Sequence, residues 1–260
     1  MCGITGFIQY GGGSRDELSQ RCQRMADTIA HRGPDAGGVW VDAAYPLALG
    51  HRRLSIIDLS DAGAQPMVSA SGRYVLSFNG EVYNFPRLRE QTGVSAYPFK
   101  GHSDTEVILA AVQHLGVEGA ISKLEGMFAL ALWDREERCL WLARDRVGKK
   151  PLYYGWSGNS FLFGSELKAL RQHPDFEREL DRNALGQYLQ YGWVSQPLSI
   201  YKKVRKLPPG SLLKIAQDAT PWSAQPTQFW SARAIAEHGE RNRFTGSYAD
   251  AIRQLDTVLN

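Results

Sequence analysis

The apolar positions in the first half of the chain predict short strands and two longer helices. Helical spacing follows two capping boxes, in which Ser14 pairs with Glu17 and Ser103 pairs with Glu106. A shorter polar helix is expected near residues 86–91. Apolar runs bounded by Gly, Pro and Asp predict strands at residues 4–8, 39–41, 47–49, 54–57 and 74–78.

The second half of the chain also contains predicted helices and short strands. Helices are expected at residues 165–170 and 183–191, and a last helix from Ser247. Apolar runs predict strands at residues 127–133, 139–143, 161–164 and 211–215. The strands cluster in two groups with helices between them, and some connections are as short as hairpins. This pattern favours an α+β layered sandwich with antiparallel sheets over a βαβ alternation.

Composition narrows the classes of protein to consider. The chain has 260 residues, of which 43% are hydrophobic and 22% charged, as in ordinary soluble globular domains. No apolar run approaches the ~20 residues that a membrane span requires, so no membrane partner is expected. The net charge of +3 is scattered, and its densest cluster, at residues 202–206, lacks the aromatic residues of a single-strand binder. Nucleic acid is therefore not an expected partner.

The cysteines indicate a reducing compartment. Cys2, Cys22 and Cys139 show no CxxC spacing and cannot all pair, which argues against a disulfide framework or a zinc site. The first 15 residues lack the basic start and long apolar middle of a signal peptide, so we expect a cytoplasmic protein. Cys22 lies on the apolar face of a predicted helix and Cys139 begins a predicted strand, which is typical of packed side chains.

Cys2 is the candidate nucleophile. Removal of Met1 would leave a residue that carries a thiol and a free α-amine together. An α-amine has a pKa of about 7.7–8.0 and a thiol about 8.5, so the amine can accept the thiol proton near neutral pH. Cysteine in second position also occurs by chance, and this interpretation therefore needs support from other residues.

Asn79 and Gly80 follow a predicted strand and allow two interpretations. An Asn-Gly pair is typical of a type I′ hairpin turn. An Asn amide beside a Gly N–H is also a pair of donors suited to the oxygen that becomes negative during acyl transfer.

Charged residues near these positions are equally ambiguous. Arg52 and Arg53 could form surface ion pairs or hold a carboxylate, which the guanidinium fork fits well. Asp104 lies in the first turn of a predicted helix, where a carboxylate suits the helix dipole. It could instead pair with the ammonium group of a substrate.

Nine stretches in the same order resemble one known family. They are residues 1–7, 31–35, 51–58, 63–66, 78–84, 103–104, 124–129, 144–148 and 165–168. Together they resemble the glutaminase domain of the asparagine synthetases, within the class II, N-terminal-nucleophile glutamine amidotransferases. The His-Arg-Gly-Pro-Asp sequence at residues 31–35 favours this branch over the sugar-phosphate and phosphoribosyl amidotransferases.

The resemblance implies a fold, a substrate and a set of site residues. The fold would be a four-layer αββα sandwich, and the substrate L-glutamine. Cys2 matches the nucleophile, and Asn79 and Gly80 match the oxyanion donors. The implied glutamine-binding residues are Arg53 for the α-carboxylate, Asp104 with Glu81 for the α-ammonium, and further Leu54, Ile57, Asn79 and Gly80.

The resemblance also implies a partner and a domain organisation. We expect a glutaminase domain at residues 2–216, a linker at 217–246 and, at 247–260, the first helix of an ATP-dependent synthetase domain. No cofactor or metal is expected in this chain, because ATP and Mg²⁺ would bind the synthetase domain, whose Ser-Gly-Gly-x-Asp-Ser phosphate loop does not occur here. A homodimer is left open. So are another carboxylate acceptor, such as a sugar acid, and a non-catalytic binding module if Met1 is retained.

Overall fold

The computed structural model describes residues 1–91 and 93–259 and contains two compact units, Met1–Trp230 and Ser231–Asn260. The first unit is built on two six-stranded sheets whose strand pairs are all antiparallel. One sheet has the order β10-β8-β9-β1-β3-β2, with β1 (Gly3–Gln9), β2 (Ala36–Val41), β3 (Leu47–Arg53), β8 (Tyr153–Ser157), β9 (Ser160–Gly164) and β10 (Val204–Lys206). The other has the order β12-β11-β7-β6-β5-β4, with β4 (Met67–Val68), β5 (Tyr74–Val82), β6 (Gly126–Asp134), β7 (Cys139–Arg144), β11 (Ser211–Ile215) and β12 (Thr227–Gln228).

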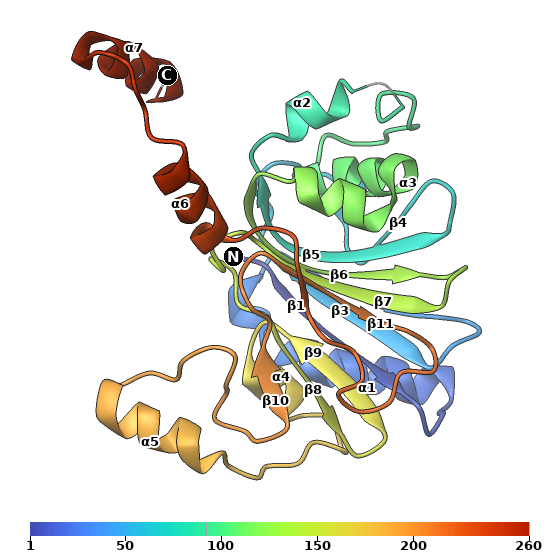
Figure 1. The fold of residues 1–260 in the computed structure, drawn as a ribbon. Coiled ribbons are helices and arrows are strands. Elements are labelled where there is room, and N and C mark those ends of the chain that lie inside the picture. The colour runs from blue at the N-terminus through green and yellow to red at the C-terminus, as the bar shows by residue number, and fades with distance from the viewer. Residues whose placement is uncertain (92, 260) are drawn as a thin grey trace. The chain divides into compact units, whose positions relative to one another are not determined.

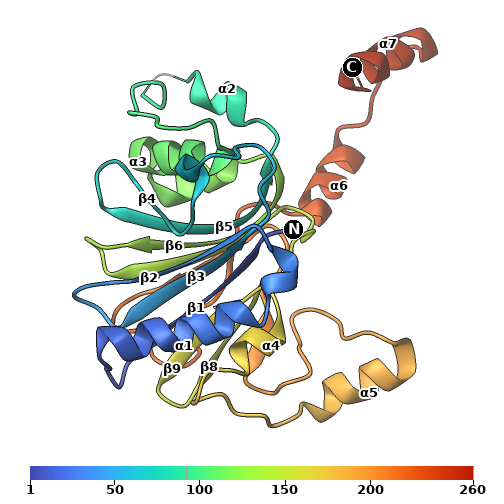
Figure 2. The ribbon, with the colours of Figure 1, turned by 180° about the vertical axis from the view of Figure 1, so that it is seen from behind.

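Helices cover the outer face of each sheet (Figures 1 and 2). Helices α1 (Arg15–Asp27) and α4 (Leu167–Leu170) lie on the β1-containing sheet, α3 (Asp104–Lys123) lies on the β5-containing sheet, and α2 (Phe85–Arg89) packs against α3. Helix α5 (Arg182–Tyr191) and the 3₁₀ turns η1 (Ala30–Arg32) and η2 (Asp61–Gly63) complete the unit. The layers are therefore helix, sheet, sheet and helix, which confirms the expected four-layer sandwich.

Each interface between neighbouring layers is filled by its own apolar cluster. In β1, Ile4 and Ile8 point between the sheets while Phe7 packs with α1, as the period-2 alternation of a strand requires. In β6, Phe128 packs on the α3 side and Ala129 lies between the sheets. Because both faces of these strands are buried, their sequences are nearly continuous apolar runs.

Both predicted capping residues begin helices. Ser14 accepts a hydrogen bond from the N–H of Glu17, whose carboxylate accepts one from the N–H of Ser14, so this capping box is complete. Ser103 accepts from the N–H of Glu106. The carboxylate of Glu106 instead accepts from the N–H groups of Lys100 and Gly101, at 2.8 and 2.9 Å. Only half of the second capping box forms, and Glu106 fixes the loop before α3.

One local prediction and one of two interpretations left open from the sequence are wrong, and both concern the region around the candidate site. Residues 54–57 are not a strand, because β3 ends at Arg53 and the chain then leaves the sheet. The N–H of Ser55 bonds the carboxylate of Asp35 at 2.8 Å rather than a neighbouring strand. Asn79 and Gly80 form no hairpin turn, because β5 continues through both residues and pairs with β6 as far as Val82.

The second unit consists of α6 (Ala232–Arg241) and α7 (Tyr248–Leu259). Helix α6 falls in the range expected as a linker, where the sequence pattern predicted no helix. The expected helix at 247–260 is found as far as Leu259, and its last position lies outside the described residues. Its apolar stripe is exposed, at Tyr248, Ile252, Leu255 and Leu259. Among the described residues, no helix has the length and apolar character needed to span a membrane.

Candidate active site

Cys2 is held at the start of β1 by contacts from three segments. The next residue, Gly3, pairs with Arg52 of β3, which brings Cys2 beside the end of that strand. The carbonyl of Cys2 accepts a hydrogen bond from Nε of Arg32 at 3.0 Å, and its Sγ accepts one from the N–H of Leu54 at 3.3 Å. The half-buried thiol is thus fixed in position by the backbone.

The electrostatic setting of Cys2 combines opposing influences. Burial is the largest of them and raises the pKa of the thiol. The hydrogen bond from the Leu54 N–H and the charges of the Met1 amine and of Arg53 act in the opposite direction. Conversion to a thiolate at neutral pH therefore depends on nearby positive charge and on a base that removes the proton.

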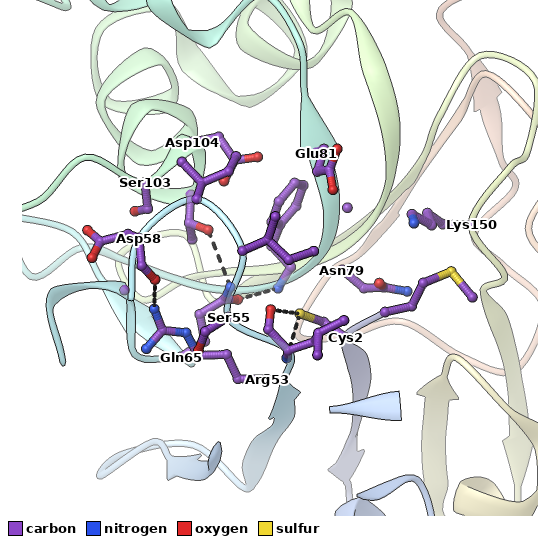
Figure 3. A pocket seen from close by; sticks show the side chains of 18 of the residues that line it. Cys2, Arg53, Ser55, Asp58, Gln65, Asn79, Glu81, Ser103, Asp104 and Lys150 are labelled. Carbon is purple, nitrogen blue, oxygen red and sulfur yellow. Dashed lines mark hydrogen bonds between the residues drawn. The ribbon is translucent and has the colours of Figure 1, made fainter. Parts of the chain in front are cut away.

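A cavity of about 170 Å³ opens beside Cys2 (Figure 3). The structure brings all of the sequence-predicted site residues to its wall: Cys2, Arg53, Leu54, Ile57, Asn79, Gly80, Glu81 and Asp104. Cys2 directly precedes β1, and the others come from β3, β5, the N-terminus of α3 and the loop after β3.

The edge of β5 leaves one N–H group free to face the cavity. Alternate residues of a strand direct their N–H groups to the same side, and here the N–H groups of Phe78 and Val82 bond the side chains of Gln65 and Asp104, at 2.7 and 3.0 Å. Gly80 lies between them, and no described side chain accepts from its N–H. A Cβ at Gly80 would clash with the carbonyl oxygen of Met127, so only glycine fits.

Asn79 presents an unusual buried amide. Its side chain is fully buried, and neither Nδ2 nor Oδ1 has a hydrogen-bond partner among the described residues. Most buried polar side-chain atoms are hydrogen-bonded, because an unsatisfied one costs about 1–3 kcal/mol. An Asn amide kept in this state beside a cavity is available to a ligand.

The two neighbouring arginines point to opposite sides of β3. Arg53 lines the cavity, and its guanidinium donates to the carbonyl oxygens of Ser60, at 2.9 Å, and Asp58. Arg52 lies on the other face and pairs with Asp27 of α1. Of the two, Arg53 is therefore the one placed to meet a bound carboxylate.

The acidic side of the cavity is formed by Asp104 and Glu81. Asp104 is 5% exposed, and burial raises its pKa to about 6, although the hydrogen bond from the Val82 N–H partly opposes this shift. The neighbouring carboxylate of Glu81 raises that pKa further. A cationic group bound here would relieve both effects, because it would stabilise the ionised form of Asp104.

Several residues of the cavity wall were not named as site residues from the sequence. Gln65 and Asp58 lie in stretches that resemble the family, so the resemblance contained a usable signal for them. Lys150 lies in a charged loop that gave no such signal. Among the described residues, no group of three or more His, Cys, Asp or Glu side chains is arranged to hold a metal ion.

Comparison with known proteins agrees with this geometry. The family model of the glutamine amidotransferase domain matches residues 1–230, so the chain belongs to this family. Asparagine synthetase [glutamine-hydrolyzing] 3 of Bacillus subtilis is 34% identical over 266 residues, which cover 100% of this chain and 40% of that protein. Asparagine synthetase [glutamine-hydrolyzing] 1 of the same organism is 39% identical over 84% of this chain and 34% of its own length.

The comparisons confirm the family resemblance drawn from the sequence. Among solved structures, the glutamine phosphoribosylpyrophosphate amidotransferase from B. subtilis matches with a TM-score of 0.64 over 88% of this chain and 49% of its own. At 18% identity this likeness concerns the fold alone. The chain spans 34–40% of the length of the two asparagine synthetases.

Proposed function

We propose that this chain hydrolyses L-glutamine at Cys2. The Cys2 thiolate attacks the side-chain amide carbon, and the resulting oxyanion accepts hydrogen bonds from the Asn79 amide and the Gly80 N–H. Collapse breaks the C–N bond, and the nitrogen takes a proton and leaves as ammonia. Water then cleaves the γ-glutamyl thioester, which releases glutamate and restores the thiol.

The observation that carries the proposal is the pair of unused donors beside a thiol. Asn79 has a buried amide with no partner among the described residues, and Gly80 directs an N–H toward the same cavity as Cys2. Donors held in place before reaction stabilise developing negative charge without a cost of reorganisation. A non-catalytic module would have no need to leave these groups unsatisfied.

The ends of the cavity suit the zwitterionic part of glutamine. In the proposal, Arg53 binds the α-carboxylate, while Asp104 and Glu81 bind the α-ammonium. Leu54 and Ile57 of the loop after β3 complete the glutamine-binding set. Opposite charges on separate segments would orient the amide toward Cys2.

Substitution of the nucleophile tests the proposal. Cys2→Ala should abolish ammonia release from glutamine while glutamine binding and the unfolding temperature stay close to wild type, because only the reacting atom is lost. Cys139→Ala is the matched control: this thiol is buried in the core, so its loss should lower stability and leave turnover intact. Ammonia release that persists in Cys2→Ala would refute the mechanism.

The state of the N-terminus decides between catalysis and a binding role. A retained Met1 would convert the amine of Cys2 into an amide and remove the proposed base. Mass spectrometry of the purified protein should therefore find Cys2 as the first residue, and a preparation with Met1 retained should release ammonia more slowly.

We further propose that the ammonia serves an ATP-dependent synthetase domain that amidates aspartate. The similarity to two asparagine synthetases supports this acceptor, and the alternative is another carboxylate, such as a sugar acid. ATP and Mg²⁺ would bind that domain. Residues 1–260 with glutamine, ATP, Mg²⁺ and aspartate should form ammonia and no asparagine; asparagine formation by these residues alone would show the division to be wrong.

We also propose domain boundaries and a cellular location for this chain. We propose residues 2–216 as the glutaminase domain, 217–246 as the connection, whose first part up to Trp230 still packs in the first unit, and 247–260 as the beginning of the synthetase domain. The exposed stripe of α7 supports this assignment, because an isolated helix of its length is marginal in water. Amides of α7 should accordingly exchange with deuterium far faster than those of α3. Three free cysteines are consistent with a cytoplasmic protein.

A further inference from the structure

Lys150 is a buried cation that the proposed chemistry does not use. Its side chain is 4% exposed and lines the cavity that contains Cys2. Its ammonium group has no hydrogen bond or ion pair with any described residue. In Figure 3 it lies on the side of the pocket occupied by Asn79 and Glu81, away from Asp58.

The backbone holds Lys150 firmly. Its N–H donates to the carboxylate of Asp145 at 3.0 Å, and its carbonyl accepts from Nε of Arg144 at 2.7 Å. Asp145 is fully buried, and its carboxylate also accepts from the N–H groups of Phe128 and Lys149, at 3.1 and 2.9 Å. The Asp145 carboxylate is thus engaged by backbone groups, which leaves the Lys150 ammonium without a paired carboxylate.

The charges around Lys150 and Cys2 come from several elements. They are Glu81 of β5, Asp104 of α3, Arg53 of β3, Arg32 of η1, Asp145 after β7 and the amine of Met1. Burial lowers the pKa of Lys150, and the negative charge of Glu81 is the main opposing influence. Cys2 in its ionised form opposes the shift as well, so the thiolate and the ammonium stabilise each other.

We propose that Lys150 is a positioning residue for Cys2: the positive charge that Lys150 holds at the cavity wall favours the thiolate of Cys2 over the thiol. Low-dielectric walls strengthen the interaction between two charges relative to water. The charge of Lys150 would thus oppose the effect of burial at Cys2, which disfavours the thiolate. The inference rests on the proposed nucleophile, but thiolate formation can be measured without turnover of glutamine.

The test is the pH dependence of alkylation at Cys2. Iodoacetamide reacts with thiolates, and mass spectrometry of the N-terminal peptide separates Cys2 from Cys22 and Cys139. Lys150→Met should slow alkylation at pH 7 about three- to tenfold and raise the midpoint by about half to one pH unit. Lys150→Arg should stay near wild type. Lys149→Met is the matched control and should change nothing, because the side chain of Lys149 is exposed.

Two outcomes would overturn the inference. One is an unchanged alkylation profile in Lys150→Met, and the other is equal slowing in Lys150→Met and Lys150→Arg, which would indicate a purely structural role. If Lys150→Met does not fold, Lys150→Gln gives the decision by the same measurement. If Lys150→Met shifts the alkylation profile while the wild-type protein releases no ammonia from glutamine, the proposed function is refuted and this inference stands.

Discussion

One wall of the cavity is strand β5, and another is the loop of residues 54–63, which we call the strand wall and the loop wall. All nine residues of β5 pair with β6, and Asn79 is fully buried. The loop wall contains only the 3₁₀ turn η2 and exposes Ile56 and Leu59, at 57% and 77%. It is held by side chains, chiefly by the bonds of Arg53 to its carbonyl groups.

This difference in structure indicates that the two walls have different roles. A hydrogen-bonded ladder fixes donors within fractions of an ångström, which stabilisation of a transition state requires. A loop with few backbone bonds opens locally at low cost, which suits the entry and release of a substrate. Substitution of the proposed oxyanion donor Asn79 in the strand wall should therefore affect turnover, and substitution of Arg53, which holds the loop wall, should affect affinity.

The largest effect within this comparison is expected at Asn79. Asn79→Ala should lower kcat for glutamine about 10²–10³-fold with little change in KM, because one oxyanion donor is lost. Ser77→Ala is the matched control on the same strand: its hydroxyl bonds the carbonyl of Gly50, so the substitution should cost stability and leave kcat unchanged. A rise in KM alone for Asn79→Ala would assign this residue to binding.

A smaller effect, of the opposite kind, is expected at the base of the loop wall. Arg53→Met should raise KM for glutamine about thirtyfold, equivalent to about 2 kcal/mol, because the α-carboxylate loses its partner. Arg53→Lys should not restore affinity, since a lysine lacks the guanidinium fork. Arg52→Met should leave KM unchanged, because Arg52 pairs with Asp27 on the other face of β3. Equal effects of Arg52→Met and Arg53→Met would contradict the assignment.

The strand wall and the loop wall also differ in how well the sequence predicted them. The strands of the sheet core were predictable, because alternation and continuous apolar runs report burial on one or both faces. The loop wall was predicted as a strand at residues 54–57, because Leu54, Ile56 and Ile57 are apolar and β-branched residues favour strands. Local propensity could not reveal that Leu54 and Ser55 bond groups distant in sequence, Cys2 and Asp35.

The site residues show the same limit. The types of Cys2, Asn79 and Asp104 suggested their chemistry from the sequence alone, but only the family resemblance related them to each other. The unpaired state of Asn79 and the isolation of Lys150 depend on contacts from distant segments, which no sequence pattern records. The local structure at Asn79 and Gly80 was ambiguous, because the same pair of residues can form a hairpin turn or continue a strand at its edge.

The smallest expected effect is a dependence of glutamine affinity on pH, set by Asp104. Burial raises its pKa to about 6, so the carboxylate is neutral below this pH and ionised above it. Only the ionised form attracts the α-ammonium. Calorimetry on Cys2→Ala, which lacks the titrating thiol, should therefore find glutamine bound about tenfold more weakly at pH 5 than at pH 7.

The same shift fixes the sign of the effect on stability. The folded-state pKa of Asp104 lies above its unfolded value of 3.8. The contribution of Asp104 to the free energy of unfolding is therefore fully present below about pH 4 and is lost as pH rises through about 6. Bound glutamine should reverse this loss, since its ammonium stabilises the ionised carboxylate. In Asp104→Asn, affinity should be low and nearly independent of pH in this range. If Cys2→Ala binds glutamine with equal affinity at pH 5 and pH 7, Asp104 does not bind the α-ammonium, and Glu81 is left as the partner of that group.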